Sequence, residues 1–325
     1  MLRSGDRVLI IGGTRYIGRH TCLAALAAGA KVTVFHRGRS GNEWIGAQPE
    51  VERILGDRTV PDDLARAFRS DYDAVYDMIA YRPEEIRPLL GPHADRIGHL
   101  VVCSTTSVYA PALYQPIDEA HPRGPHPAWG AYNEGKNAVE DLLASGGGVR
   151  STVLRPQWVF GPHDYQHLAA FYLTRLHAGR PVWLSHAGVA QLNWTYAPDL
   201  AAAFVAVGGV PAAAGQAFNV CAEETLTTLE FIRLCAAVLG VTPDIRHYRS
   251  EDLPGELRGQ RSGPVRDLPL ACTSQRLRSL PGLDPAFRPT SMPAALVHTV
   301  EWLRTSGGLD AFPRTPLEDH LNAGG

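Results

Sequence analysis

The chain has 325 residues, 45% of them hydrophobic, and its 31 lysines and arginines nearly balance its 33 aspartates and glutamates. A chain of this length can bury a large core in one large or two closely joined domains. The near-neutral charge favours neither a nucleic-acid partner nor a membrane partner, and without a signal-peptide pattern or a transmembrane-length apolar run we expect a cytoplasmic protein.

The first predicted elements are a strand, a glycine turn and a helix. The apolar run Arg7–Ile11 predicts a buried strand, and apolar residues at helical spacing predict a helix from Tyr16 to Leu26. Gly12 permits a tight turn, Gly18 lets the helix pack closely on the sheet, and the N–H groups at the helix start can accept a pyrophosphate. A glycine turn of this kind is by itself a weak signal for dinucleotide binding.

Five further β-rich runs alternate with helical stretches along the chain. They cover residues 31–38, 51–57, 73–80, 99–105 and 151–156. This alternation predicts an α/β fold of Rossmann type with a doubly wound parallel sheet. We place the dinucleotide-binding domain at residues 1–156, with further sheet and helix elements near 188–222. Segments 157–187 and 223–325 contain many irregular stretches and predict mainly a smaller, loop-rich C-terminal lobe that binds the substrate.

The segment "AYNEGK" carries the first candidate chemistry. It places Tyr132 and Lys136 four residues apart, on one face of a helix that we expect to begin near Pro127. An adjacent ammonium group and an oxidised nicotinamide both lower the pKa of a phenol, so Tyr132 could exchange a proton near neutral pH. Thr105, at the end of the preceding β-rich run, could donate a hydrogen bond to a substrate oxygen beside Tyr132. The Tyr-x-x-x-Lys spacing alone is a common helix pattern, but its order after the glycine turn is specific.

Taken together, these motifs resemble the extended branch of the short-chain dehydrogenase/reductase superfamily, which contains nucleotide-sugar epimerases, dehydratases and reductases. The resemblance covers nearly the whole chain, through "GGTRYIG", Asp57 after the third strand, "STTSVY", "YNEGK", "LRPQWVFGP", "APDLAAAF", "AFNV" and "TSQRLRSL…TVEWL". It implies an NAD(P)-dependent oxidoreductase whose catalytic set is Thr105, Tyr132 and Lys136.

The same resemblance implies where a dinucleotide binds. Gly12 and Gly18 would hold the pyrophosphate, Asp57 would meet the adenine, and the backbone around Pro156 and Gln157 would meet the nicotinamide amide. The full set of expected cofactor-binding residues is Gly12, Thr14, Arg15, Tyr16, Ile17, Gly18, His36, Arg37, Asp57, Ala80, Pro156 and Gln157.

Arg15 and the end of the second strand indicate which dinucleotide is preferred. A cation in the first turn of a helix opposes the helix dipole unless an anion binds there. NAD-binding proteins carry an acid after the second strand, where this chain has His36 and Arg37. Arg15 and Arg37 together could clamp a 2′-phosphate, and shorter superfamily members that use NADPH also have arginine at these two places. We therefore expect NADP(H), with NAD(H) less favoured; the alternative is that both arginines are solvated surface residues.

Departures from the family pattern narrow the expected chemistry. Thr106 and Ser107 stand where the sugar dehydratases carry an Asp-Glu pair, so we do not expect dehydration. Trp158 replaces an asparagine that usually touches a nucleotide sugar, and Leu192 replaces a diphosphate-binding arginine, whereas Arg261 fits a basic position of the family. The candidate substrate-binding residues are Tyr81, Thr106, Trp158, His163, Asn193 and Arg261.

A metal site is not expected. His163 and His167 stand four residues apart in "GPHDYQH", but no third ligand is evident, and His163 precedes Asp164, which we expect to be a helix N-cap.

The leading hypothesis is an NADPH-dependent ketoreductase that acts on a sugar-like or hydroxylated cyclic ketone, as in natural-product biosynthesis, with or without a linked nucleotide. Tyr132 would be the proton donor. An NAD(P)-dependent sugar epimerase that works through a keto intermediate is the alternative. A third reading is a dinucleotide sensor or RNA-binding protein without catalysis, because "GGTR" followed by an aromatic residue, Ile and Gly also resembles a chloroplast RNA-binding branch of the superfamily.

The expected partners follow from these hypotheses. We expect a small-molecule substrate, no nucleic acid and no membrane. The resemblance also implies a homodimer, because the helices after residue 80 and around Tyr132 form a paired four-helix interface in relatives.

Overall fold

The computed structural model describes residues 2–112, 114–146, 148–185, 187–266, 268–310 and 312–323. The chain forms two compact units. The first comprises Met1–Gln157, Ala197–Cys221 and Cys272–Pro289, and the second comprises Trp158–Tyr196, Ala222–Ala271 and Thr290–Gly325. These limits differ from the expected division, because residues 188–196 lie in the second unit and residues 272–289 in the first. The latter segment carries α9 (Gln275–Arg278), which packs against a strand of the first unit's sheet.

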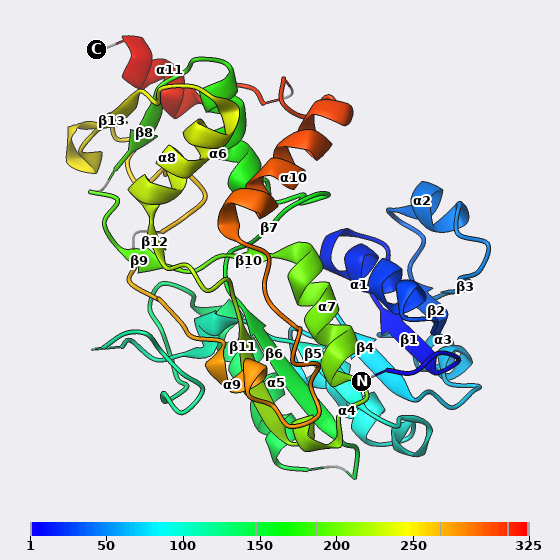
Figure 1. Ribbon diagram of the computed structural model, residues 1–325. Coiled ribbons are helices and arrows are strands. Elements are labelled where there is room, and N and C mark those ends of the chain that lie inside the picture. Colours follow the sequence, from blue (N-terminus) through cyan, green and yellow to red (C-terminus); the bar gives the residue numbers. More distant parts are fainter. Residues whose placement is uncertain are drawn as a thin grey trace. The chain divides into compact units, whose positions relative to one another are not determined.

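A seven-stranded parallel sheet forms the centre of the first unit (Figure 1). Its strands are β1 (Arg7–Ile11), β2 (Lys31–His36), β3 (Glu52–Leu55), β4 (Ala74–Asp77), β5 (Leu100–Cys103), β6 (Ser151–Pro156) and β11 (Gln216–Val220). The order across the sheet is β11-β6-β5-β4-β1-β2-β3, so the direction of winding reverses between β1 and β4. The predicted doubly wound Rossmann-type fold is therefore confirmed, and sheets of this kind bind ligands outside the carboxyl ends of the strands, at the reversal point.

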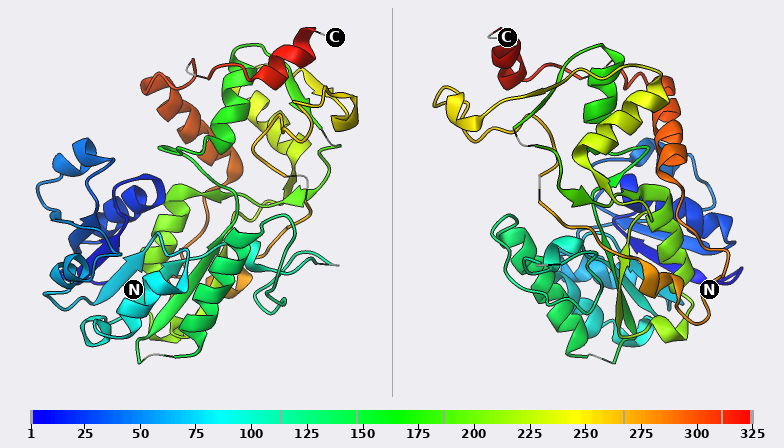
Figure 2. Two further views of the ribbon diagram at one scale, coloured as in Figure 1. Left: turned by 180° about the vertical axis from the view of Figure 1, so that it is seen from behind. Right: turned by 60° about the vertical axis from the view of Figure 1, so that its left-hand side comes forward.

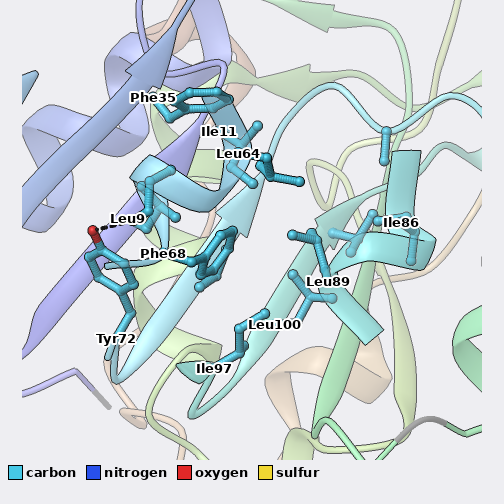
Figure 3. Packing of buried hydrophobic residues seen from close by; sticks show 14 of the residues in the cluster. Leu9, Ile11, Phe35, Leu64, Phe68, Tyr72, Ile86, Leu89, Ile97 and Leu100 are labelled. Carbon is cyan, nitrogen blue, oxygen red and sulfur yellow. Dashed lines mark hydrogen bonds between the residues drawn. The ribbon is translucent and has the colours of Figure 1, made fainter. Parts of the chain in front are cut away.

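Helices cover both faces of this sheet (Figures 1 and 2). On one face, α3 (Pro61–Ala67), α4 (Pro83–Leu90) and α5 (Ala131–Ala144) pack on alternate strand residues. Figure 3 shows Leu9 and Phe35 of the sheet in the same buried cluster as Leu64 of α3 and Leu89 of α4. The near-continuous apolar runs of the strands follow from this arrangement, because a sheet covered on both sides needs apolar residues on both sides.

The other face of the sheet is covered by α1 (Tyr16–Ala27) and α7 (Ala197–Val207), which pack against each other. The rings of Tyr76 on β4 and Phe204 on α7 lie 5.7 Å apart. The short helix α2 (Asn42–Gly46) follows β2. In the described residues, no helix combines the length and the apolarity that crossing a bilayer requires.

The second unit has a core of aromatic side chains. The Trp194 and Phe231 rings stack with centroids 3.7 Å apart. Its helices are α6 (Leu168–His177), α8 (Thr228–Leu239), α10 (Met292–Thr305) and α11 (Pro316–Ala323). The described residues of this unit also form strand pairs: β7 (Val159–Phe160) with β10 (Thr195–Tyr196), β8 (Val182–Leu184) with β13 (Ile245–His247), and β9 (Gln191–Leu192) with β12 (Leu226–Thr227). Arg175 and Glu318 form a buried ion pair that attaches α11 to α6.

Two helices begin later than the sequence predicts. α5 begins at Ala131 rather than near Pro127, because Gly130 has a positive φ of 49° and ends a turn in which its N–H donates to the His126 carbonyl. α6 begins at Leu168, after a left-handed residue at His167. Asp164 still caps this helix from a distance, because its carboxylate accepts the Leu168 N–H at 2.8 Å.

His99 makes the stability of the first unit depend on pH. Its buried ring lies within hydrogen-bond distance of the Thr152 hydroxyl and the Gly208 carbonyl, and burial lowers the pKa of His99 to about 4. Because the folded pKa lies below the unfolded value, the unfolded chain binds more protons between these two values. His99 therefore costs no stability above about pH 6.5 and up to about 3 kcal/mol as the pH falls toward 4.

We expect wild-type protein to lose more unfolding free energy than His99→Gln between about pH 7 and pH 4.5. Urea denaturation at the two pH values measures this difference. An equal loss in both proteins would show that His99 does not carry this pH dependence.

Candidate active site

The glycine turn after β1 forms a compact start to α1. Gly12 has a φ of 86°, and its N–H donates to the Phe35 carbonyl at 3.1 Å. A Cβ atom at Gly18 would lie 2.2 Å from the Gly12 carbonyl oxygen, so only glycine allows this close approach. Among the described residues, the N-cap residue Arg15 gives α1 no side-chain capping bond, and the first turn of α1 contains no acidic residue. The N–H groups at this end suit an anion such as a dinucleotide pyrophosphate.

Two arginines, Arg15 and Arg37, follow the carboxyl ends of neighbouring strands beside this turn. β1 and β2 are neighbours, with Ile11 opposite Phe35, so the segments carrying Arg15 and Arg37 start next to each other. Arg15 is the exposed N-cap residue of α1. Arg37 is half-exposed, and its Nη1 lies 3.9 Å from the Asp57 carboxylate.

Asp57 keeps a negative charge close to Arg37. Its carboxylate accepts hydrogen bonds from the Thr59 N–H at 3.0 Å and the Thr59 hydroxyl at 2.8 Å. These two bonds lower the pKa of Asp57, and the charges of Arg37 and Arg39 lower it further. The structure thus gives Arg37 a carboxylate neighbour that sequence reasoning did not consider.

His36 ends β2 with a buried ring. Its Nδ1 accepts the Gly38 N–H at 3.2 Å, which assigns the proton of the neutral ring to Nε2. Burial and then the charge of Arg53 lower the pKa of His36, so the ring is neutral at pH 7. In the part of the chain that the structure describes, Nε2 has no hydrogen-bond partner. A buried donor of this kind suits a ribose or phosphate oxygen of a dinucleotide.

The segment after β2 packs directly on the glycine turn. The Trp44 indole N–H donates to the Thr14 carbonyl at 2.6 Å, and the Arg19 guanidinium lies 4.8 Å from the Trp44 ring centroid. A Cβ atom at Gly41 would lie 2.1 Å from the same Thr14 oxygen. Trp44 and Gly41 therefore fix this loop against the turn that holds Thr14, Tyr16 and Ile17, three of the expected cofactor residues.

α5 places Tyr132 and Lys136 one turn apart. Lys136 is only 2% exposed, and its ammonium donates to the carbonyls of Ala80 at 2.8 Å and Cys103 at 2.7 Å. These carbonyls follow β4 and end β5, so the ammonium ties the carboxyl ends of two central strands to the helix. Burial lowers the pKa of Lys136. Acidic groups around it oppose this shift, namely Cys103, Asp77, Glu140 and Glu85.

Tyr81 lies beside both of these residues. Its ring centroid is 4.5 Å from the Lys136 ammonium and 6.3 Å from the Tyr132 ring centroid. Tyr81 is 44% exposed and Tyr132 is 42% exposed, so two accessible phenols flank one buried cation. The Glu85 carboxylate accepts the Tyr81 N–H at 2.6 Å and fixes this segment at the start of α4.

Gly135 permits the close contact between Tyr81 and α5. A Cβ atom at Gly135 would lie 2.4 Å from the Tyr81 carbonyl oxygen, which is backbone and cannot turn away. Glycine-to-alanine changes in helices usually stabilise by about 1 kcal/mol. We expect Gly135→Ala instead to destabilise by about 1–3 kcal/mol, the usual cost of overpacking. Denaturant unfolding measures the change, with Glu134→Ala, an exposed neighbour on the same helix, as the control. A more stable Gly135→Ala variant would contradict the contact.

Hydroxyl groups gather after β5. Thr105 is buried, and its Oγ1 accepts the Ser107 N–H at 3.1 Å. Thr106 is buried in the short 3-10 turn Thr106–Val108. The Asn133 side-chain amide donates to the Ser107 carbonyl at 2.6 Å, which ties this turn to α5 one residue after Tyr132.

A buried network lies next to these groups. The Ser104 hydroxyl donates to the Glu140 carboxylate at 2.5 Å, and the Arg155 guanidinium donates to both oxygens of the same carboxylate, at 3.1 Å from Nε and 2.5 Å from Nη2. Arg155 also donates to the Tyr109 hydroxyl at 2.9 Å, which in turn donates to the Asn219 side-chain oxygen at 2.6 Å. We call these five residues the Glu140–Arg155 network. It joins β5, β6, β11 and α5.

A second buried ion pair lies at the end of β4. Arg58 donates to both oxygens of Asp77, at 2.8 Å and 2.7 Å, and the Ile79 N–H donates to Asp77 at 3.0 Å. Burial alone would lower the pKa of Arg58, but the Asp77 carboxylate raises it above its usual value. The ion pair fixes Arg58, the residue after Asp57, to the segment that leads from Asp77 to Ala80 and Tyr81.

The remaining expected residues lie further along the chain. Pro156 ends β6, and Gln157 follows it as a buried residue of the first unit. Trp158, His163, Asn193 and Arg261 belong to the second unit. There the His163 ring lies 5.0 Å from the Trp302 ring, and the Trp158 ring lies 6.5 Å from that of Trp194.

Asn193 and Arg261 differ in their surroundings. Asn193 is buried, and its side-chain N–H groups donate to the carbonyls of Ala222 and Glu224, so they hold that loop in place. Arg261 is exposed and lies close enough to Arg266 to lower its pKa, after the larger effect of burial. Among the described residues, no three or more histidine, cysteine or acidic side chains are arranged to hold a metal ion.

The structure thus brings most of the expected residues of the first unit to the carboxyl ends of the strands. Lys136 joins Ala80, Tyr81 and Cys103, and Arg37 joins Asp57. Sequence reasoning missed Trp44, Arg58 with Asp77, and Glu140 with Arg155. The sequence signal for the four charged residues was a charged side chain in or beside an apolar segment, and Trp44 had no such signal.

The chain is similar in sequence and fold to known proteins. The sequence profile of the NAD dependent epimerase/dehydratase family matches residues 8–87 and 91–221. The chain is 27% identical over 299 residues to the chloroplast stem-loop binding protein of 41 kDa b of Arabidopsis thaliana, covering 87% of this chain and 76% of that protein. It is 28% identical over 171 residues to the UDP-glucose 4-epimerase of Rhizobium leguminosarum bv. trifolii, covering 47% of this chain and about half, 51%, of that protein.

Solved structures share the fold at low sequence identity. The dTDP-glucose 4,6-dehydratase of Bacillus anthracis in complex with NAD has a TM-score of 0.77 and 18% identity, covering 94% of this chain and 98% of that chain. The UDP-glucuronic acid 4-epimerase of Bacillus cereus, in complex with UDP-glucuronic acid and NAD, has a TM-score of 0.70 and 16% identity, covering 92% and 99%.

Proposed function

The chain belongs to the NAD dependent epimerase/dehydratase family and is an NAD(P)-dependent enzyme of the extended short-chain dehydrogenase/reductase type, and we propose that it is an NADPH-dependent ketoreductase acting on a sugar-like or hydroxylated cyclic ketone. One observation carries the proposal. An accessible phenol, Tyr132, lies one helical turn from a buried ammonium, Lys136, at the carboxyl ends of the central strands.

Each of the proposed catalytic side chains has a separate role in the reduction. A bound nicotinamide supplies the hydride that the ketone accepts at its carbonyl carbon. Tyr132 donates the proton that the carbonyl oxygen needs, and the positive charge of Lys136 stabilises the phenolate that remains. The Thr105 hydroxyl orients the carbonyl oxygen, and its position is held by the bond to the Ser107 N–H.

The start of α1 and the end of β2 would hold the dinucleotide. Gly12 and Gly18 allow its pyrophosphate to approach the start of α1, and Asp57 offers a carboxylate for the adenine amino group. The His36 Nε2–H, a buried donor without a partner among the described residues, favours a ribose or phosphate oxygen. Arg15 and Arg37 favour the 2′-phosphate of NADPH over the free hydroxyl of NADH.

We expect the double variant Arg15→Gly with Arg37→Ala to lose affinity for NADPH and to keep its affinity for NADH. A charge-assisted hydrogen bond contributes about 1.5–3 kcal/mol, so the NADPH dissociation constant should rise at least about 10-fold. Fluorescence titration with both dinucleotides measures it. Arg69→Ala, which removes an exposed arginine after α3, controls for net charge. Equal wild-type affinities for the two dinucleotides, or a preference for NADH, would contradict the NADPH assignment.

The substrate class is proposed from two features of the second unit. Arg261 and Arg266 bring two positive charges close together, which favours an anionic group such as a nucleotide diphosphate. Trp158 offers a flat apolar surface for a ring. We also propose that a second copy of the chain associates through α4 and α5 to form a homodimer.

Two other candidate functions are favoured by particular relatives. The match to a UDP-glucose 4-epimerase favours epimerisation through a keto intermediate, which would convert a nucleotide sugar without net consumption of dinucleotide. The longer match to a stem-loop binding protein favours RNA binding, although the overall charge of −2 is unfavourable for a polyanionic partner. Turnover with net NADPH oxidation distinguishes the ketoreductase from both.

A further inference from the structure

The Glu140–Arg155 network lies next to the proposed catalytic residues and contains none of them. Ser104 immediately precedes Thr105, and Glu140 follows Lys136 by one turn of α5. The Ser104 hydroxyl and the Lys136 ammonium therefore bind α5 to the same strand end, β5, from adjacent residues, because Lys136 contacts the Cys103 carbonyl. Two neighbouring turns of one helix are fixed to two neighbouring residues of one strand.

Burying the two charges of this network costs solvation free energy. The side chains of Glu140 and Arg155 are 4% and 5% exposed, so both charges have lost nearly all of their hydration. A buried ion pair contributes little or no net stability compared with well-packed apolar side chains of similar size. Its geometry, however, is highly directional, because a guanidinium group and a carboxylate form two parallel hydrogen bonds in only one relative orientation. Further hydrogen bonds of the Ser104, Tyr109 and Asn219 side chains hold the pair in this orientation.

We infer that Glu140 is a positioning residue for proton transfer: together with Arg155 it holds Ser104, and through it Thr105, in register with the face of α5 that carries Tyr132 and Lys136. This inference rests on the proposed roles of Thr105, Tyr132 and Lys136. Losing the network would let the strand end and the helix shift relative to each other, and misplacements of about 1 Å can cost about 100-fold in rate.

The first test compares two buried arginine–glutamate pairs. Glu140→Gln should lower kcat about 10-fold to 100-fold and leave the NADPH dissociation constant within about 2-fold of wild type. Glu318→Gln is the matched control, because Glu318 forms an equally buried bidentate pair with Arg175 in the second unit. It should lower the thermal midpoint by a similar amount and leave kcat of the folded protein unchanged.

The second test isolates the contact to the strand end. Ser104→Ala leaves the Glu140–Arg155 pair intact and should lower kcat, whereas Ser104→Thr retains the hydroxyl and should restore most of it. The double variant Ser104→Ala with Glu140→Gln should match the slower single variant, because both changes break the same connection. If Glu140→Gln does not fold, the Ser104 variants alone decide the question.

The outcomes separate this inference from the proposed function. If Glu140→Gln and Ser104→Ala keep wild-type kcat while Tyr132→Phe is inactive, the positioning role is wrong and the ketoreductase proposal stands. Additive losses in the double variant would equally contradict a shared path. If Tyr132→Phe retains wild-type turnover, the proposed function itself fails.

Discussion

Tyr132→Phe lowers kcat by about 10²–10⁴-fold and leaves folding and NADPH affinity nearly unchanged, if Tyr132 is the proton donor. The change removes one oxygen and keeps the ring volume, so the aromatic neighbour of Tyr81 is retained. Without the phenol, the carbonyl oxygen must take its proton from water, which is a poor and badly placed acid at neutral pH. Steady-state turnover of a ketone that the wild type reduces well, together with a fluorescence titration of NADPH, measures both quantities.

Two further variants test whether the loss is specific to Tyr132 and what Lys136 contributes. Tyr114→Phe makes the same change at an exposed tyrosine outside the site and should leave kcat unchanged. Lys136→Met should lower both kcat and dinucleotide affinity, because we propose that this ammonium also holds the ribose of the dinucleotide. If Tyr132→Phe keeps more than about a tenth of wild-type turnover, the loss lies below the range of a general acid, and the assignment is wrong.

Asp77→Ala destabilises the protein by about 3–5 kcal/mol, because it leaves the Arg58 guanidinium buried without its counter-ion. The double variant Arg58→Met with Asp77→Leu removes both buried charges. It should recover most of the stability that Asp77→Ala loses. Urea denaturation gives the free energy of unfolding for each protein.

An exposed ion pair in the same unit supplies the control. Arg96 and Asp71 contact each other at 3.0 Å with both side chains largely accessible to water, so Asp71→Ala should cost less than about 1 kcal/mol. A similarly small loss for Asp77→Ala would mean that water or another group compensates Arg58, and the pair would not fix the segment leading to Ala80 and Tyr81.

The sequence predicted the central architecture because strands and helices of a doubly wound sheet are short, regular and apolar. The runs that became β1, β2, β4, β5 and β6 are almost wholly buried, and their apolar residues indicate this burial without knowledge of distant contacts. The spacing of Tyr132 and Lys136 likewise predicted their common helix face, since four residues correspond to about one turn.

The side-chain contacts that sequence reasoning missed join residues that are distant in the chain. The Ser104 hydroxyl meets a carboxylate 36 residues later, and Trp44 reaches a carbonyl 30 residues earlier. A local pattern cannot predict such pairs. The late start of α5 has a local cause, the positive φ of Gly130, but glycine is compatible with several backbone conformations, so its presence alone did not fix the helix boundary.

Ketone reduction is tested by the transfer of deuterium from NADPH labelled at the nicotinamide C4 position. The acceptors are a panel of keto sugars and hydroxylated cyclic ketones, with and without a linked nucleotide diphosphate. Mass spectrometry of the alcohols reports the transfer. We expect at least one labelled alcohol with wild-type protein, and labelling that is at least about 100-fold slower with Tyr132→Phe. If wild-type protein binds NADPH and a stem-loop RNA but labels no member of the panel, the ketoreductase account is contradicted.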